Sequence, residues 1–239
     1  MEIFTKKDAQ LLAVKEAEPS QTMQRRQFLR YAGAGTAAVG LLAASACKKD
    51  RNSYSGVYLG SGDIGILNYA YALEQLEAAF YTQVVANSAF ATQFSTDEQL
   101  FLTDIRNHEV AHREFFKTAL GASAITSLEV NFSSINFADR SSVLNTAKAF
   151  EDLGVSAYNG AGYLIKSATY LTLAGKIVSV EARHAAYIRD LVSPNTFVGS
   201  DVVAVGSTGL EMSKSPSQVL AIAGTYITTQ INAEDLPTS

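Results

Sequence analysis

The sequence is poor in the residues on which several common kinds of protein depend. A single cysteine, Cys47, excludes an internal disulfide and any zinc site built from cysteines. There is no tryptophan and there are only four prolines, while alanine and leucine recur at helical spacing, which favours helices over a sandwich or barrel. From Cys47 onward, 13 Lys and Arg residues stand against 19 Asp and Glu residues with no basic stripe, so we expect no nucleic-acid partner.

Residues 1–46 have the pattern of a targeting signal. The run from Arg25 and Arg26 to Arg30 resembles the twin-arginine export signal, and the weakly apolar stretch after it is short for a membrane span. Small residues before Cys47 resemble a lipoprotein cleavage site, which makes Cys47 a candidate for lipidation; ordinary cleavage nearby is the alternative. We expect export by the twin-arginine route to the periplasm or a membrane anchor, with residues 47–62 as a Ser- and Gly-rich tether.

Residues 63–192 are expected to form one domain of four long helices. The predicted spans, from caps, glycines and apolar spacing, are 63–86, 96–120, 142–165 and 168–192. About 20 residues separate the second helix from the third, enough to cross the length of a bundle. Residues 193–239 are predicted to be a loop, a short fifth helix opened by Ser215 and Pro216, and a frayed acidic tail.

The second predicted helix holds two of the three histidines of the chain. His108, Glu109 and His112 form His-Glu-x-x-His, in which both histidines would hold zinc and the glutamate would act as general base. Glu109 and His112 alone form Glu-x-x-His, whose i and i+3 side chains are neighbours on a helix and can hold a metal inside a bundle.

An internal repeat favours the second interpretation. Glu181 and His184 have the same Glu-x-x-His spacing, but Val180 stands where the first copy has a histidine.

The repeat extends upstream of both motifs. Glu74 corresponds to Glu151, and Tyr81 corresponds to Tyr158 at the same offset. Because seven residues make about two helical turns, the Glu and Tyr of each helix share one face.

Together these positions supply one Glu from each of two helices and Glu-x-x-His from each of two others, as in a carboxylate-bridged di-metal centre. The candidate metal ligands are Glu74, Glu109, His112, Glu151, Glu181 and His184. With this set, the chain resembles the ferritin-like superfamily over residues 63–192, and specifically the exported bacterial ferritin-like domain proteins related to desiccation-associated proteins. The resemblance implies an all-α, ferritin-like four-helix bundle with a long connection between helices 2 and 3 and a short C-terminal fifth helix.

The resemblance also implies a role for each residue. Glu109 and Glu181 would bridge two iron or manganese ions, and each histidine would bind one ion. The remaining ligands, Glu74 and Glu151, would be terminal. Four carboxylates neutralise four positive charges, and two neutral imidazoles complete the ligand set. Behind the ligands, Tyr81 and Tyr158 would hydrogen-bond to carboxylates across the bundle, unless they are ordinary core tyrosines.

Three functions remain open at this point. The first is a redox enzyme acting on O2 or peroxide, by Fe(II) oxidation or peroxide removal. The second is a metal-binding or metal-free bundle with a structural or stress-protective role and no turnover. The third, a zinc peptidase, would leave the second Glu-x-x-His motif unexplained. No cage-forming surface of a storage ferritin is evident, and another oligomer remains an option.

Two residues near the candidate ligands are not part of the set. Without the zinc interpretation, His108 is expected to cap the bundle edge or bond a backbone carbonyl. Glu77 is the weaker candidate on its helix because Gly154 stands at the equivalent position of the repeat. It is expected to be an ordinary charged neighbour, and contact with the metal or with the ligands is the alternative.

Overall fold

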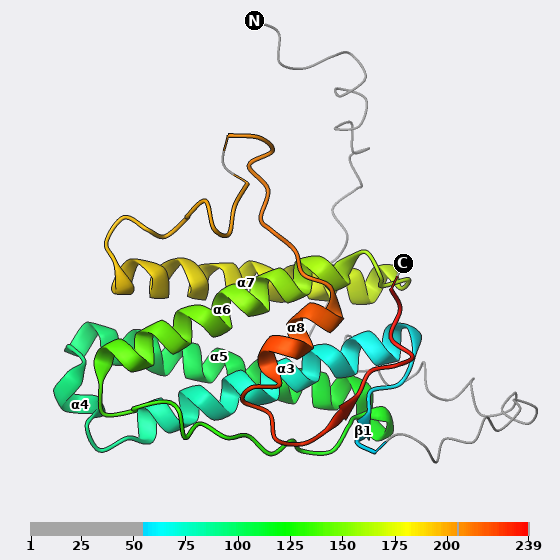
Figure 1. Cartoon of the computed structure of the whole chain (residues 1–239), viewed down its shortest axis with the longest axis horizontal. Coiled ribbons are helices and arrows are strands. Elements are labelled where there is room, and N and C mark those ends of the chain that lie inside the picture. Colours follow the sequence, from blue (N-terminus) through cyan, green and yellow to red (C-terminus); the bar gives the residue numbers. More distant parts are fainter. Residues whose placement is uncertain (1–54, 205, 239) are drawn as a thin grey trace, which may run out of the picture. The chain divides into compact units, whose positions relative to one another are not determined.

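The computed structural model describes residues 55–204 and 206–238, and four long helices dominate this part of the chain. They are α3 (Gly62–Ala86), α5 (Thr96–Leu120), α6 (Arg140–Gly162) and α7 (Ala168–Val192). Helix α3 packs against α5, α6 packs against α7, and the two pairs meet through α3 and α6 (Figure 1). The predicted all-α four-helix bundle is confirmed.

The helix ends follow from local capping. At the start of α5, the Ser95 side chain accepts from the Glu98 backbone N–H while the Glu98 carboxylate accepts from the Ser95 N–H. Helix α6 begins two residues earlier than predicted because the Asp139 side chain accepts from the Ser141 N–H and caps it there. Among the described residues, none of the helices has both the length and the apolar character needed to cross a membrane.

Several short elements were not predicted. They are α4 (Phe90–Gln93), the 3-10 helix η2 (Gly121–Ser123), and the strands β1 (Val57–Tyr58) and β2 (Ile231–Asn232). The predicted fifth helix is present as α8 (Pro216–Ala223), which starts with a capping box at Ser215.

The two strands join the segments that precede and follow the helices. They pair in parallel, and Leu59, which follows β1, is fully buried. The described part of the predicted tether, residues 55–62, therefore packs on the bundle, because it gains a strand partner and a buried leucine. The predicted frayed tail also packs, through β2 and the buried Leu236. The predicted signal segment and Cys47 lie outside the described residues.

The long connection between α5 and α6 runs along the bundle (Figure 1). It is held by four buried apolar side chains, Ile125, Phe132, Ile135 and Phe137. Asn68 of α3 fixes its start, since the amide nitrogen donates to the carbonyls of Leu59 and Ser123 and the amide oxygen accepts from the Ile125 N–H. One buried amide thus joins α3 to both flanking segments.

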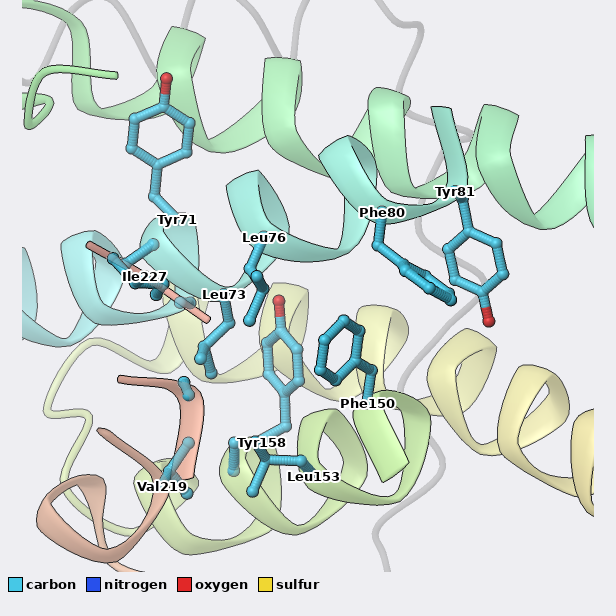
Figure 2. Packing of buried hydrophobic residues seen from close by; sticks show 14 of the residues in the cluster. Tyr71, Leu73, Leu76, Phe80, Tyr81, Phe150, Leu153, Tyr158, Val219 and Ile227 are labelled. Carbon is cyan, nitrogen blue, oxygen red and sulfur yellow. The ribbon is translucent and has the colours of Figure 1, made fainter. Parts of the chain in front are cut away.

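Apolar side chains of α3 and α6 meet in the buried core, as Figure 2 shows. Phe80 of α3 meets Phe150 of α6 edge-on, with ring centroids 5.1 Å apart. Val219 of α8 and Ile227 beyond it approach the same core from the C-terminal segment (Figure 2). Any charged group placed at this depth is therefore surrounded by apolar side chains.

Gly160 of α6 lets the C-terminal segment approach closely, and this contact is testable. A Cβ at residue 160 would lie 1.8 Å from the backbone oxygen of Lys214, whose N–H donates to the Ser156 carbonyl. Gly160→Ala is therefore expected to lower the free energy of unfolding by about 1–3 kcal/mol in urea denaturation. The control is Gly175→Ala on α7, where a Cβ meets nothing within 4 Å. It should gain about 0.5–1 kcal/mol through helix propensity. A Gly160→Ala protein as stable as the wild type would contradict this packing.

Candidate metal centre

The six side chains singled out in the sequence lie together inside the bundle. They form two groups whose ligand atoms lie within 4.8 Å of one another: Glu74, Glu109, His112 and Glu181 in the first, and Glu109, Glu151, Glu181 and His184 in the second. Glu109 of α5 and Glu181 of α7 belong to both groups. Each group also takes one single Glu, from α3 or from α6, so all four long helices contribute.

The two shared glutamates divide their oxygens between the two histidines. His112 Nδ1 lies 2.8 Å from Glu181 Oε1 and 3.8 Å from Glu109 Oε2. His184 Nδ1 lies 2.9 Å from Glu109 Oε1 and 3.6 Å from Glu181 Oε2. Each carboxylate therefore presents one oxygen to each group, as a bridging ligand would.

The single glutamates complete a pseudo-twofold arrangement. Glu74 Oε2 lies 3.5 Å from His112 Nδ1, and Glu151 Oε2 lies 3.5 Å from His184 Nδ1. The equal distances follow from the internal repeat, which places equivalent residues in equivalent surroundings. All four glutamates of the two groups are 0% exposed.

The donor atoms of the six side chains have the character of metal ligands. Each of the six contributes at least one buried oxygen or nitrogen with no hydrogen-bond partner among the described residues. The Nδ1 atom of His112 is one of these. It lies 2.8 Å from Glu181 Oε1, but the two side chains are not aligned for a hydrogen bond. Buried polar atoms normally have partners. Carboxylate and imidazole ligands that converge in this way suit a divalent transition metal.

Two buried tyrosines hold the single glutamates. Tyr81 of α3 donates to Glu151 Oε1 at 2.5 Å, and Tyr158 of α6 donates to Glu74 Oε1. Figure 2 shows Tyr81 reaching from α3 towards α6, and Tyr158 reaching the opposite way. Each tyrosine thus crosses the bundle and leaves the other oxygen of its glutamate, Oε2, for the group of ligands. Burial raises the pKa of both hydroxyls well above the usual range, so they stay protonated donors.

The carboxyl groups differ in their affinity for protons. Burial raises the pKa of Glu74 well above its ordinary value and that of Glu151 to about 8. Burial acts on Glu109 too, but its contacts with His112 and His184 outweigh that effect and lower its pKa to about 2.

The two histidines sit in a strongly negative environment. Burial alone would lower the pKa of His112, but the surrounding glutamates raise it to about 12. Burial is likewise outweighed at His184, whose pKa is raised chiefly by the charge of Glu151 and by contacts with the other glutamates. Both imidazoles therefore hold protons that a bound cation would have to displace.

Glu77 differs from its expected place as an ordinary charged neighbour. Its side chain is buried, at 4% exposure, and one of its oxygens would lie 3.1 Å from a Cβ at Gly154. Burial, followed by the charges of the four glutamates in the groups, raises the pKa of Glu77 well above its ordinary value. It belongs to neither group. The pairing of Glu77 with Gly154 in the repeat was the sequence signal for this burial, because a glycine leaves room for the side chain of a neighbouring helix.

His108 also differs from its expectation. Its Nδ1 lies 2.9 Å from Nε2 of His184, so its partner is another imidazole and not a backbone carbonyl. It belongs to neither group of converging ligands. A zinc peptidase needs His108 and His112 to hold one ion, and this arrangement does not bring them together.

The comparison with protein families agrees with this geometry. A family model described as the ferritin-like domain matches residues 62–194, which span all four long helices and all six converging side chains. A search of curated proteins finds no match for the chain.

The raised pKa of Glu151 predicts how the stability of chelator-treated protein depends on pH. An acid whose pKa is raised by folding binds its proton more tightly in the folded state. The stability that it contributes is fully present below its unfolded pKa and is lost as the pH rises from there through its folded pKa. For Glu151 this window runs from 4.5 to about 8. His112, raised from 6.5 to about 12, adds a loss in the same direction above 6.5. The melting temperature should therefore fall from pH 5 to pH 8.

Glu151→Gln should flatten that fall, because the amide has no proton to lose. Thermal melts followed by circular dichroism at several pH values measure the slope. Glu129→Gln is the matched control, since Glu129 is exposed and distant from the groups in sequence. Equal slopes in the wild type and Glu151→Gln would contradict the assignment.

Proposed function

Because the chain belongs to the ferritin-like domain family, we propose that its bundle holds two iron or manganese ions and uses them in redox chemistry toward O2 or peroxide. The ligands would be the six converging side chains: Glu74, Glu109, His112, Glu151, Glu181 and His184. The observation that carries the proposal is the division of the two oxygens of Glu109 and of Glu181 between the two histidines. A single-ion site would not require it.

Charge balance supports two divalent ions. Four ionised glutamates would offset four positive charges, and two neutral imidazoles add donors without adding charge. The protons that Glu74, Glu151 and the histidines hold would then leave as cations bind. The protein supplies a preformed set of ligands, since both tyrosines already hold the single glutamates in place.

Iron or manganese bound there would supply one-electron redox chemistry, which amino-acid side chains at this site lack. The protein controls access to the ligands. The four glutamates are fully buried, whereas the side chain of His112 is 14% exposed and that of His184 only 5%. A small oxidant would therefore approach from the His112 side.

A metal-binding bundle without turnover is the second candidate, and the burial of the site favours it. Structural metal sites are closed, whereas catalytic sites keep an open position. Here the four glutamates are 0% exposed. In that case metal binding would stabilise the bundle and consume no oxidant.

Reconstitution of the full chain separates the two candidates. Protein stripped with chelator should bind about two equivalents of Fe(II) or Mn(II) and then consume O2 or hydrogen peroxide. The same protein loaded with Zn(II), which has no redox chemistry, is the control. Oxidant consumption no faster than in the zinc control would support the structural candidate. Tight binding of one zinc equivalent alone would contradict both.

Two buried glutamates provide a matched test of the ligand assignment. Glu151 is in a ligand group and Glu77 is not, although both are buried on adjoining helices. Metal at about 1,000 times its Kd stabilises a folded protein by about 4 kcal/mol. Glu151→Ala should abolish most of the metal-dependent rise in melting temperature, whereas Glu77→Ala should keep most of it. Comparing each variant with and without metal cancels any general loss of stability. Equal losses in both variants would contradict the assignment.

We also propose that the chain is exported by the twin-arginine route, which carries folded proteins and so would allow metal to be loaded beforehand. The proposal rests on Arg25 and Arg26 and on the small residues before Cys47. Replacing both Arg25 and Arg26 by Lys should retain the protein in the cytoplasm on cell fractionation, and Cys47→Ser should release exported protein from the membrane fraction. Arg30→Lys, outside the pair, is the control. Unchanged export of the double variant would refute the route.

A further inference from the structure

His108 stands directly before the ligand candidate Glu109, yet it faces a different helix. Its Nδ1 lies 2.9 Å from Nε2 of His184 on α7. The two rings are nearly parallel, with an interplanar angle of 9° and centroids 5.1 Å apart. His108 is exposed while His184 is buried, so the pair joins the protein surface to one ligand group.

The chemistry of imidazole fixes the direction of this hydrogen bond. Nδ1 of His184 faces the carboxylates of its group, at 2.9 Å from Glu109 Oε1. A nitrogen that binds a metal carries no proton, so the proton of the neutral His184 ring is then on Nε2. That N–H donates to Nδ1 of His108, whose own proton is on its Nε2. With a cation bound at Nδ1, this tautomer makes both contacts of His184 favourable, because Nδ1 then faces the cation and Nε2–H faces an acceptor.

The other ligand histidine, His112, has no such partner in the part of the chain that the structure describes. Val180 occupies the position in the repeat that corresponds to His108. Across residues 55–204 and 206–238, no hydrogen bond reaches Nε2 of His112, whereas its Nδ1 faces the carboxylates as in His184. The two groups are thus alike in their ligands and differ behind one imidazole.

We propose that His108 is a positioning residue that orients His184 and makes its group the tighter of the two metal-binding groups. A hydrogen bond to the far nitrogen of a ligand histidine fixes its tautomer and ring orientation and makes the ligating nitrogen more basic. Such partners change metal affinity by about 10–100-fold. The inference rests on the proposed function, and it adds that a divalent transition metal fills the His184 group first.

Titration of chelator-stripped full-length protein with Co(II), followed by visible absorption, measures the two binding steps. The wild type should show two unequal dissociation constants. His184→Ala should remove the tighter step and His112→Ala the weaker one, which assigns each step to a group.

The variants at His108 and Val180 then test the proposal. His108→Ala should weaken the tighter step by about 10–100-fold and leave the weaker one unchanged. His108→Asn should restore most of the loss, because its side-chain oxygen can accept the bond from His184 Nε2. Val180→His should give His112 an equivalent partner and tighten the weaker step. Combined with His108→Ala, it should reverse the order of filling.

The outcomes distinguish the role of His108 from the proposed metal site. A wild type with two Co(II) steps that His108→Ala leaves unchanged, or weakens equally, would overturn the role of His108 and leave the proposed site intact. A wild type that binds no Co(II), Fe(II) or Mn(II) would overturn both. Circular dichroism melts of the stripped variants establish that each one is folded, as expected for substitutions at the exposed His108.

Discussion

The arrangement of this bundle depends on the burial of four carboxyl groups at one place in an apolar core. Glu74, Glu109, Glu151 and Glu181 are all 0% exposed. An ionised carboxylate moved out of water is costly unless it is paired, binds a cation or takes up a proton. Imidazole contacts keep Glu109 acidic, while burial drives Glu151 toward its protonated form. Such a cluster is tolerable without metal only by holding protons, and divalent cations can take their place.

The internal repeat makes this concentration of charge symmetrical. Equivalent distances in the two groups agree to within a few tenths of an ångström, because equivalent helices present the same residues at the same positions. The symmetry fails at two places near the centre, where Glu77 is matched by Gly154 and His108 by Val180. In both cases the first half of the repeat has the polar side chain and the second half lacks it. Differences between the two groups therefore arise behind the ligands and not in the ligands themselves.

The sequence was sufficient for the four long helices and for the convergence of the six side chains. Caps such as Ser95 with Glu98 are local, and the spacing of Glu-x-x-His determines one helix face whatever the partner. Contacts between distant segments were not predictable in this way. The two-residue strands are too short to show a period, and Leu100 and Phe101 of α5, although apolar, are 62% and 47% exposed. Helical spacing indicates which residues share a face, but the neighbour across the bundle decides whether that face is buried.

The same limit explains Glu77, and charge balance explains its state. The repeat shows that the position equivalent to Glu77 is a glycine, Gly154. That the Glu77 side chain lies against Gly154 becomes apparent only when α3 and α6 are packed together. With two divalent ions, four ionised glutamates already complete neutrality, so a fifth negative charge at this depth would have no counterpart. Burial and the charges of the four glutamates both keep the pKa of Glu77 high, and so favour its protonated form. The bundle can therefore hold a fifth carboxyl group beside the site without making that group a ligand.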